Sequence, residues 1–419
     1  MLSLNFIREN RDLVAKAIAD KNVSVDLDGL LRLDGEVRAL KQEVEELRRQ
    51  RKELSGTFKS TPADQQAALR ERVNGIAQAI GDIETRLTER EEALNGLMLR
   101  LPGIPWEGAP VGPDENSNVV IRTEGAVPAF DFEPRDHVQL IEMNDWADLS
   151  RITQVSGSRT YALKGRLAML ESALMFWAQQ KLANEGFTLM TVPALARPHA
   201  FFATGHFPGH EEEAYEIPKD DLYLAGTGEI ALTSLHSGEI LESQQLPILY
   251  AGYSPCFRRE AGSAGRDVRG LLRVHQFYKL EQYVICEDDD AVSAEWHAKL
   301  LANAEALLTD LEIPYQVVET STGDMGLGKF RMNDIESWVP SLGKYRETHS
   351  CSTLHDWQAR RANLRWRDGE RKVRFVHTLN NTALASPRIL VPLLENHQLA
   401  DGRVRLPKAL QPLMGGEFL

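Results

Sequence analysis

The chain has 419 residues and a mass of 47.0 kDa, with 42% hydrophobic and 26% charged residues, which excludes a disordered or collagen-like protein. Its formal net charge of -13 argues against a protein that binds nucleic acid over its whole surface. The charge is uneven, because residues 1–100 hold 17 Lys and Arg against 18 Asp and Glu. The N-terminal module is therefore far less repulsive to a polyanion than the rest of the chain.

The cysteines and the hydropathy pattern set the expected environment. Cys256, Cys286 and Cys351 form no CxxC pair, so neither a disulfide framework nor a cysteine-rich zinc site is expected. No run of 18 apolar residues occurs, and charges interleave from Arg8 onward, so we expect neither a membrane span nor a signal peptide. The expectation is a soluble, reduced, cytoplasmic protein.

The first part of the chain is predicted to be helical. Residues 6–22 have the pattern of one short amphipathic helix. Beyond them, two runs with alternating steps of four and three have the a/d pattern of a coiled-coil seam, and Gly56 and Pro62 break the chain between them. Two such helices pack most simply as an antiparallel hairpin over about 27–100. The seam positions are Leu33, Val37, Leu40, Val44, Leu47, Arg51 and Leu54, then Leu69, Val73, Ile76, Ile80, Ile83, Leu87, Arg90, Leu94 and Leu97.

The hairpin pattern alone is compatible with two roles. It fits a structural or dimerising coiled coil, and it also fits an arm that holds something large. Near the tip, the first helix carries Arg48, Arg49, Arg51 and Lys52. A basic cluster on a nearly neutral arm would suit phosphate contacts, whose energy comes from counterion release. A short basic run is also common on a solvated helix face, so both roles remain open.

The remaining chain is predicted to form a mainly antiparallel sheet. Residues 101–118 concentrate Pro, Gly and polar residues and are expected to form a linker. Beyond it, helical stretches at 163–185 and 291–310 alternate with β-rich segments, several of which follow one another without a helix. The expected strands lie at 188–192, 246–254, 276–286, 315–319, 335–340 and 373–379.

A GxxxxGK sequence at 323–329 is a weak signal for a P-loop. Phe330 stands where a P-loop needs Ser or Thr for magnesium. The following residues have a strand pattern, whereas a P-loop needs a helix whose N-terminus faces the phosphates. We therefore do not expect a P-loop.

Two histidine pairings are equally weak signals for a metal. His206 and His210 are separated by a Pro-Gly pair, so we expect a turn rather than one helical face. Cys351 and His355 would bind a metal only with two further ligands, and the sequence offers no obvious pair.

The most informative segment is 253–281, which begins and ends like a strand and holds a basic, glycine-rich loop. A strand–loop–strand hairpin can present guanidinium groups to a phosphate with a bidentate geometry that lysine lacks. A surface loop with incidental arginines is the alternative. The loop contains Arg258, Arg259, Gly262, Gly265, Arg266, Arg269 and Gly270.

This segment resembles the second signature motif of class II aminoacyl-tRNA synthetases, in the form seen in bacterial-type seryl-tRNA synthetases. The resemblance spans nearly the whole chain in the family's order. The helix at 163–185 and Pro193 resemble the first, dimer-forming motif, and the hairpin stands where the family carries its tRNA-binding arm. Further matches are the serine-binding loop at 227–229, TGDMG at 322–326, YRETHSCS at 345–352, DWQARRANLR at 356–365 and the third motif with the C-terminal region at 377–416.

The resemblance implies an α+β protein in which a helical hairpin precedes a class II antiparallel β-sheet flanked by helices. It implies a tRNA-binding domain at 1–100, the linker, and a catalytic domain at 119–419. The implied enzyme is a serine–tRNA ligase, which converts L-serine and ATP to seryl-adenylate and then transfers the seryl group to the 3′ end of tRNA(Ser). We expect tRNA(Sec) to be a substrate as well. The implied cofactors are ATP and Mg²⁺ without tightly bound zinc, and the implied assembly is a homodimer with no membrane contact.

The family's nucleotide-binding residues carry over by position. Arg258 would hold the α-phosphate and the serine carboxylate, and Arg388 would close the opposite face near the γ-phosphate. Glu260 would bind the adenine amino group, Phe277 would stack on the adenine, and Val274 would contact the nucleotide through its backbone. Glu347 and Ser350 match the family's ATP and magnesium ligands. The implied ATP set is Arg258, Arg259, Glu260, Val274, Phe277, Glu347, Thr348, His349, Ser350 and Arg388, of which Arg258, Glu347 and Arg388 are the implied catalytic residues.

The serine-binding residues carry over in the same way. Glu281 and Thr382 match the positions that bind the serine hydroxyl, and buried partners for a hydroxyl can reject alanine by about 10⁴ or more. The implied serine set is Thr227, Gly228, Glu229, Arg258, Glu281, Asn380 and Thr382.

The sequence departs from the family pattern at three places. TGE replaces TAE at 227–229, HTLNNT replaces HTLNGS at 377–382, and Pro387 stands before Arg388 in a stretch that usually holds glycines. Gly228 could loosen its loop, and the added methyl group of Thr382 could narrow the pocket against threonine. The departures keep the functional groups, so they affect fine specificity more than activity.

Two other classes of function stay in view. A synthetase-like enzyme could load a carrier protein or a small acceptor, but such relatives lack a full arm. A non-enzymatic relative would be expected to lose Arg258, Glu260, Glu347 or Arg388, and all four are present.

Overall fold

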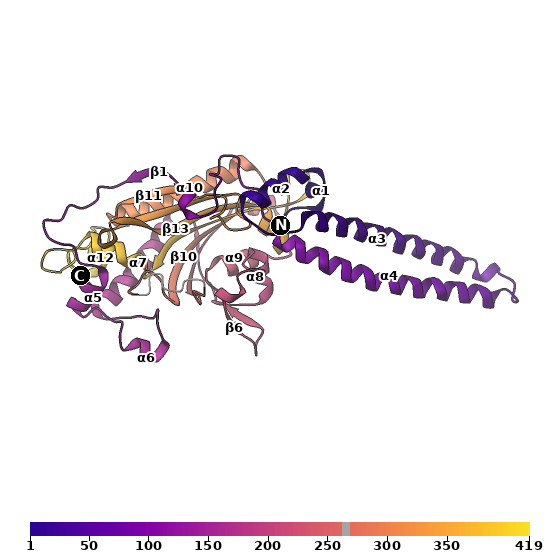
Figure 1. Cartoon of the computed structure of the whole chain (residues 1–419), viewed down its shortest axis with the longest axis horizontal. Helices are drawn as coiled ribbons and strands as arrows, with labels where there is room; N and C mark the ends of the chain where they lie inside the picture. The colour runs from indigo at the N-terminus through magenta and orange to yellow at the C-terminus, as the bar shows by residue number, and fades with distance from the viewer. Residues whose placement is uncertain (262–268) are drawn as a thin grey trace. The chain divides into compact units, whose positions relative to one another are not determined.

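The computed structural model describes residues 1–261 and 269–419, so Gly262, Gly265 and Arg266 of the basic loop lie outside the described residues (Figure 1). The chain divides into two compact units. The smaller comprises 2–19 and 23–101, and the larger comprises Met1, 20–22 and 102–419. No described helix is both long and apolar enough to cross a membrane.

The smaller unit contains the expected helical hairpin. Helices α3 (Leu27–Gly56) and α4 (Gln66–Arg100) run side by side in opposite directions, with the short turn η1 (Phe58–Ser60) between them (Figure 1). Leu40, Val44, Ile80 and Ile83 form the buried core between the helices. The coiled-coil prediction is thus confirmed.

The two arginines at seam positions do not enter this core. Arg51 and Arg90 are both exposed, and Arg90 Nε forms an ion pair with Glu36 on the facing helix at 3.2 Å. Because burying a guanidinium without a partner is costly, these two side chains face water. The buried part of the seam is formed by apolar residues alone.

The prediction of one helix over 6–22 is wrong. The structure has α1 (Leu4–Glu9) and α2 (Arg11–Asp20), which are separated at Asn10. The backbone and side-chain amides of Asn10 both donate to the carbonyl of Phe6, at 2.9 and 3.1 Å. An asparagine side chain that bonds to the local backbone competes with helix continuation, which explains the break.

The larger unit is built on an eight-stranded sheet. Its neighbouring strands are antiparallel, except that the edge strand β4 is parallel to its neighbour β9. This confirms the prediction of a mainly antiparallel sheet. In spatial order the strands are β1 (Val119–Glu124), β11 (Tyr315–Glu319), β12 (Arg331–Val339), β13 (Lys344–His355), β16 (His377–Ser386), β10 (Gln276–Cys286), β9 (Ile248–Phe257) and β4 (Thr188–Thr191).

Two long helices cover the sheet and build its main core. They are α7 (Gly165–Asn184) and α10 (Asp290–Asp310), which confirm the helices expected at 163–185 and 291–310. Both contact β10 and β16, and their buried leucines share one apolar cluster with those strands. Burial of this face leaves the opposite face of the central strands for polar side chains.

The expected strand at 373–379 is in fact two strands. Its first half is β15 (Val373–Phe375), which pairs with β14 (Arg365–Arg367) in a small sheet. Its second half begins β16, which pairs with β10 and β13. A continuous apolar run cannot reveal that its two halves hydrogen-bond to different partners.

Residues 102–118 are fixed to the larger unit. Backbone bonds join Gly103 to Leu327, Trp106 to Phe330 and Gly323 to Gly112, each at 2.9 Å. A Pro- and Gly-rich composition predicted the lack of a long helix or strand here. It could not predict that the segment lies along residues 322–330.

Shorter elements complete the unit. They are α5 (His137–Asn144), β2 (Ala147–Asp148), α6 (Ile152–Ser156), β3 (Ala162–Leu163), β5 (Leu195–Ala196), α8 (Pro198–Thr204), β6 (Tyr215–Ile217), β7 (Leu222–Leu224), α9 (Glu229–Ser234), β8 (Ile240–Glu242), α11 (Trp357–Ala362), α12 (Leu390–Asn396) and α13 (Gln411–Met414).

Candidate active site

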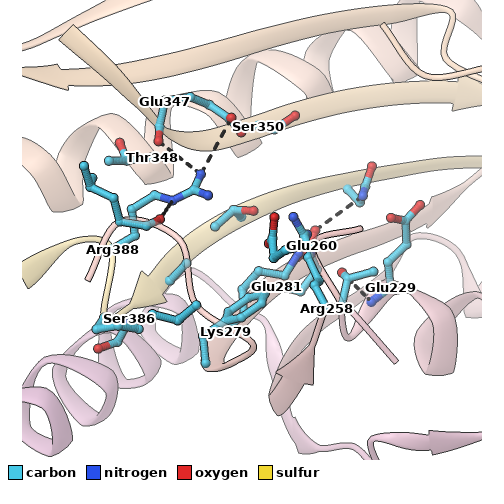
Figure 2. Close-up of a pocket in the computed structure, with 18 of the residues that line it drawn as sticks. Glu229, Arg258, Glu260, Lys279, Glu281, Glu347, Thr348, Ser350, Ser386 and Arg388 are labelled. Atoms are coloured by element: carbon cyan, nitrogen blue, oxygen red, sulfur yellow. Dashed lines mark hydrogen bonds and ion pairs between the residues drawn. The ribbon is translucent and has the colours of Figure 1, made fainter. Parts of the chain in front are cut away.

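A cavity of about 250 Å³ lies over strands β10, β13 and β16 (Figure 2). It is lined by every residue expected in the site except Gly228, Arg259 and His349. The expected residues that it brings together are Thr227, Glu229, Arg258, Glu260, Val274, Phe277, Glu281, Glu347, Thr348, Ser350, Asn380, Thr382 and Arg388.

Strand β10 supplies three of the lining side chains by simple alternation. Phe277, Lys279 and Glu281 are two residues apart, and successive side chains of a strand point to opposite faces. They therefore share the face that borders the cavity. Lys279 was not predicted, although its place between Phe277 and Glu281 follows from this alternation.

Strand β16 needs a bulge to do the same. Glu281 pairs with Thr382 whereas Leu280 pairs with Leu384, so one extra residue stands in β16 at Ala383. The bulge reverses the alternation. Thr382 and Ala385 consequently both line the cavity although they are three residues apart.

Strand β13 contains a second bulge. Glu336 pairs with Glu347 whereas Ile335 pairs with His349, which leaves Thr348 as the extra residue. Glu347 and Ser350 therefore face the same side despite a spacing of three. His349 faces the other side, is 1% exposed, and burial lowers the pKa of its imidazole to about 4.

A buried ion pair marks one end of the cavity. Lys279 Nζ contacts Glu281 Oε2, and Asn380 Nδ2 donates to Glu281 Oε1 at 3.3 Å. Burial raises the pKa of Glu281, while the neighbouring Lys279 works in the opposite direction. This end therefore offers fixed polar groups of both signs to a small polar ligand.

The loop at 227–229 adds a second buried carboxylate. Gln358 Nε2 donates to Glu229 Oε1 at 2.7 Å, and the Glu229 backbone amide donates to Thr227 Oγ1 at 3.2 Å. Burial acts to raise the pKa of Glu229, but Lys329, together with the Gln358 hydrogen bond, holds it below its ordinary value. Lys329 also lines the cavity and donates to Ser352 Oγ at 2.5 Å.

The β9–β10 hairpin presents the first arginine. Arg258 Nε donates to the Gly226 carbonyl at 3.3 Å, and its guanidinium lies 5.3 Å from the centre of the Phe277 ring. The Arg258 amide donates to the His275 carbonyl at 3.0 Å, which ties the two ends of the loop together. Glu260 accepts from Arg273 Nη1 at 2.7 Å. Strand–loop–strand geometry thus confirms the hairpin predicted for this segment.

A second arginine lies beside Glu347 of β13. Arg388 Nε donates to the Leu272 carbonyl at 3.2 Å, and Nη1 donates to the Glu347 carbonyl at 3.2 Å. The same nitrogen is 3.7 Å from Glu347 Oε2. Figure 2 shows Arg388 with Glu347 and Ser350 on one side of the cavity and Arg258 with Glu260 on the other.

Three expected residues do not reach the lining for different reasons. Gly228 is the N-cap of α9 and has no side chain to present. Arg259 is exposed at the end of β9, and its backbone amide donates to the Glu213 carbonyl at 2.9 Å. His349 is on the opposite face of β13 because of the bulge. The exposed loop residue Arg269 also lies outside the lining.

Several lining residues were missed. Besides Lys279, these include His206 after α8, Lys329 and Ser386. Burial lowers the pKa of His206 to about 4, so its ring is neutral at pH 7. No sequence spacing relates His206 or Lys329 to the strands of the site, so only the fold could reveal them.

The structure places the three weak motifs of the sequence. The GxxxxGK sequence at 323–329 precedes strand β12 rather than a helix, so it is not a P-loop. His206 and His210 lie on no common helix. Among the described residues, His355 groups with Asp290 and His377, whose ligand atoms all lie within 4.8 Å of one another and could hold a metal ion, and Cys351 is not part of this group.

The arrangement suits two neighbouring ligands. Arg258 and Arg388 can neutralise a phosphate chain, and Glu347 and Ser350 provide the oxygen atoms that a magnesium ion prefers. The buried end at Lys279 and Glu281 can bind a small zwitterion.

Comparisons with known proteins agree with this chemistry. Residues 1–105 match the model of the seryl-tRNA synthetase N-terminal domain, and residues 214–397 match the class II tRNA synthetase core domain (G, H, P, S and T). A serine–tRNA ligase from Deinococcus radiodurans is 52% identical over 99% of this chain and 98% of its own length.

Two solved structures are similar over the full length. The crystal structure of seryl-tRNA synthetase from Pyrococcus horikoshii complexed with ATP has a TM-score of 0.93 and 38% identity, and covers 100% of this chain and 99% of that one. The cytoplasmic serine–tRNA ligase from Naegleria fowleri in complex with AMP has a TM-score of 0.88 and 28% identity, with coverage of 100% and 98%. The chain therefore belongs to the seryl-tRNA synthetase family, as the resemblance of its motifs to the bacterial type predicted.

Proposed function

We propose that the cavity activates L-serine with ATP and then transfers the seryl group to the 3′ end of tRNA(Ser), and of tRNA(Sec) where one is made. The observation that carries the proposal is the pairing of two arginines and an acidic strand face with a buried Lys–Glu pair in one cavity. Attack of the serine carboxylate on the α-phosphate is an in-line displacement. It depends on positioning and charge neutralisation more than on proton transfer.

The nucleotide occupies the side of the cavity that holds the arginines. Arg258 holds the α-phosphate and the serine carboxylate together, and Arg388 binds near the γ-phosphate. Phe277 stacks on the adenine, Glu260 accepts a hydrogen bond from its amino group, and Val274 contacts the nucleotide through its backbone. Thr348 belongs to the same site and lines the cavity, whereas Arg259 and His349 are assigned to it only by the family motif. The ATP complex of the Pyrococcus relative supports the use of ATP.

Glu347 and Ser350 would hold a Mg²⁺ ion that accompanies ATP. A carboxylate and a hydroxyl on one strand face are the hard oxygen donors that this ion prefers, so the residues fit the group. When bound, the ion neutralises phosphate charge. Arg388 stays close to Glu347 and contributes to the same charge balance.

The serine lies at the Lys279–Glu281 end. Glu281 and Thr382 bind its hydroxyl group, and Thr227 and Glu229 bind its amino end, with Asn380 as a further contact and Gly228 shaping the loop. Alanine would leave these buried groups unpaired, which can give discrimination of about 10⁴. The buried state of Glu281 and its contact with Asn380 support this assignment.

The domains and the assembly belong to the same proposal. Residues 1–100 act as the tRNA-binding domain, residues 119–419 act as the catalytic domain, and 101–118 connect them. The enzyme acts as a cytoplasmic homodimer, for which the exposed Met169 and Phe176 on α7, within the dimer-forming motif, provide an apolar surface.

The test is ATP–pyrophosphate exchange without tRNA, with serine, threonine, alanine and cysteine measured in parallel. Exchange with serine well above the other three is expected. Equal exchange with alanine would contradict the assigned pocket, and no exchange with any of them would favour a non-enzymatic relative. Exchange without charging of tRNA(Ser) would instead favour the loading of a carrier protein or small acceptor.

A further inference from the structure

Strand β12 places an additional carboxylate beside Glu347 and Ser350. Asp334 is directly opposite Ser350 in the β12–β13 pair, and Glu336 is directly opposite Glu347. Residues opposite each other in antiparallel strands point to the same face. Asp334 therefore shares the strand face that we assign to the cation.

Asp334 is poorly satisfied without a ligand. The residue is 7% exposed, and its Oδ1 atom has no hydrogen-bond partner among residues 1–261 and 269–419. A buried carboxylate oxygen without a partner carries a substantial desolvation cost. An unpaired carboxylate oxygen that lies beside other oxygen donors is suited to bind a cation.

The groups around Asp334 are mostly acidic. Glu347 and Asp324 are its neighbouring carboxylates, and the Ser350 hydroxyl and Lys329 face Asp334 as well. Lys329 is already hydrogen-bonded to Ser352, and Asn118 donates to Asp324 at 2.9 Å. The three carboxylates of Asp334, Glu347 and Asp324 therefore share Lys329, which already bonds to Ser352, and Arg388, which lies beside Glu347.

Glu336 provides a useful contrast on the same strand. It also shares the face, but Gln316 Nε2 donates to its Oε2 atom at 2.5 Å. Its carboxylate therefore already has a partner within the protein. Of the two β12 carboxylates, Asp334 is the one with a buried oxygen atom, Oδ1, that lacks a partner in the described part of the chain, while the Ser350 hydroxyl bonds to the same carboxylate.

We infer that Asp334 is a further cation-binding residue, which holds the divalent cation of the ATP site together with Glu347 and Ser350. The inference rests on the proposed use of that strand face for a cation. Carboxylate oxygens are preferred ligands of hard divalent ions, and a third acidic group strengthens the site by adding charge.

The test measures Mn²⁺ binding to the full chain by electron paramagnetic resonance, with and without a non-hydrolysable ATP analogue. Asp334→Asn is expected to weaken Mn²⁺ binding at least tenfold, whereas the matched Glu336→Gln variant is expected to stay within threefold of the unchanged protein. Loss of less than threefold in Asp334→Asn would overturn the inference.

A stability measurement keeps the test independent of folding defects. In EDTA, Asp334→Asn is expected to melt at or above the unchanged protein, because it removes the cost of burying a carboxylate among other acidic groups. Mn²⁺ is then expected to raise the melting temperature of the unchanged protein more than that of the variant. A variant that melts lower in EDTA would show that Asp334 has a structural role and would overturn the inference.

The outcome separates this inference from the proposed function. If Glu347→Gln loses Mn²⁺ binding and Asp334→Asn does not, the inference about Asp334 fails while the cation site stands. If Asp334→Asn weakens Mn²⁺ binding but the unchanged protein gives no serine-dependent exchange, the inference stands while the proposed function fails.

Discussion

Lys279 and Glu281 form an ion pair on one face of β10, and their side chains are only 8% and 1% exposed. The pair lies at the buried end of the cavity, where Asn380 also donates to Glu281. Burying two charges is expensive, and removal of one partner leaves the other without compensation. A substitution in this pair is therefore expected to change both the free energy of unfolding and the binding properties of the cavity.

Replacement of Lys279 alone is expected to be severe. Lys279→Met should lower the free energy of unfolding by about 3–5 kcal/mol, because Glu281 is then buried without its cation. Urea denaturation of the unchanged and variant proteins measures this difference.

The double variant Lys279→Met, Glu281→Leu separates the two roles of the pair. It should recover most of the lost stability, since no uncompensated charge remains, but it should not recover serine-dependent exchange. Recovery of exchange in the double variant would show that the pair serves only the fold.

The loss of thermal stability at acidic pH is expected to depend on Lys329. The pKa of Glu229 is held below its ordinary value in the folded state, so its stabilising contribution is present above the unfolded value and is lost as the pH falls. Lys329→Met should therefore lower the melting temperature most near pH 7, and its effect should shrink below about pH 4.5. Melting temperatures between pH 3.5 and pH 7.5 measure this trend. The exposed Lys219 gives the control, since Lys219→Met should show no such pH dependence.

The loop at 227–229 is expected to accept alanine at Gly228. The backbone of Gly228 is helical, with φ of -63° and ψ of -21°, and an added Cβ would meet Ser254 Oγ at 3.3 Å as its nearest neighbour, a tight contact that a small rotation of the serine hydroxyl relieves. Gly228→Ala should raise stability by about 0.4–1 kcal/mol, because it reduces the freedom of the unfolded chain, and exchange with serine should persist. The matched variant Gly252→Ala should destabilise, since its Cβ would meet Leu232 Cδ1 at 2.8 Å. A loss of stability in Gly228→Ala would mean that the loop needs glycine for its conformation.

The limits of sequence reasoning are clearest at the two β-bulges. Strict alternation would place Glu347 and Ser350 on opposite faces of β13, and the same holds for Thr382 and Ala385 of β16. The bulges at Thr348 and Ala383 bring each pair onto one face, and they are visible only in the strand register. Spacing could therefore not group Glu347 with Ser350, and only the motif resemblance did; Ala385 was not predicted at all.

Other elements were accessible because their signals are local. The four–three repeat of Leu40, Val44, Ile80 and Ile83 predicts the hairpin, since a helical seam depends on neighbours within one turn. Strand β10 was predicted at its observed bounds, Gln276–Cys286. Lys329 lines the cavity and Asp334 pairs with Ser350 only because of the fold, which leaves no periodic trace in the sequence.

The arm is expected to be required for tRNA charging and dispensable for serine activation. Deletion of residues 35–95 removes most of α3 and α4 with their common apolar core, which belongs to the smaller unit. The variant should lose charging of tRNA(Ser) but retain serine-dependent ATP–pyrophosphate exchange. Loss of both activities would contradict independent roles for the two units.

A substitution at the tip of the arm sharpens this prediction. Arg48 is paired with Glu84 at 2.6 Å, and Arg49 is paired with Glu46 at 2.7 Å, so much of the basic run is neutralised within the protein. Arg51 and Lys52 are exposed, so their side chains are accessible to the phosphates of a tRNA. Arg51→Ala with Lys52→Ala should raise the KM for tRNA and weaken its dependence on salt, because fewer counterions are released on binding. The Arg48→Ala variant is the control and should change the KM less. An unchanged KM in the double variant would favour the solvated-face interpretation of the basic run.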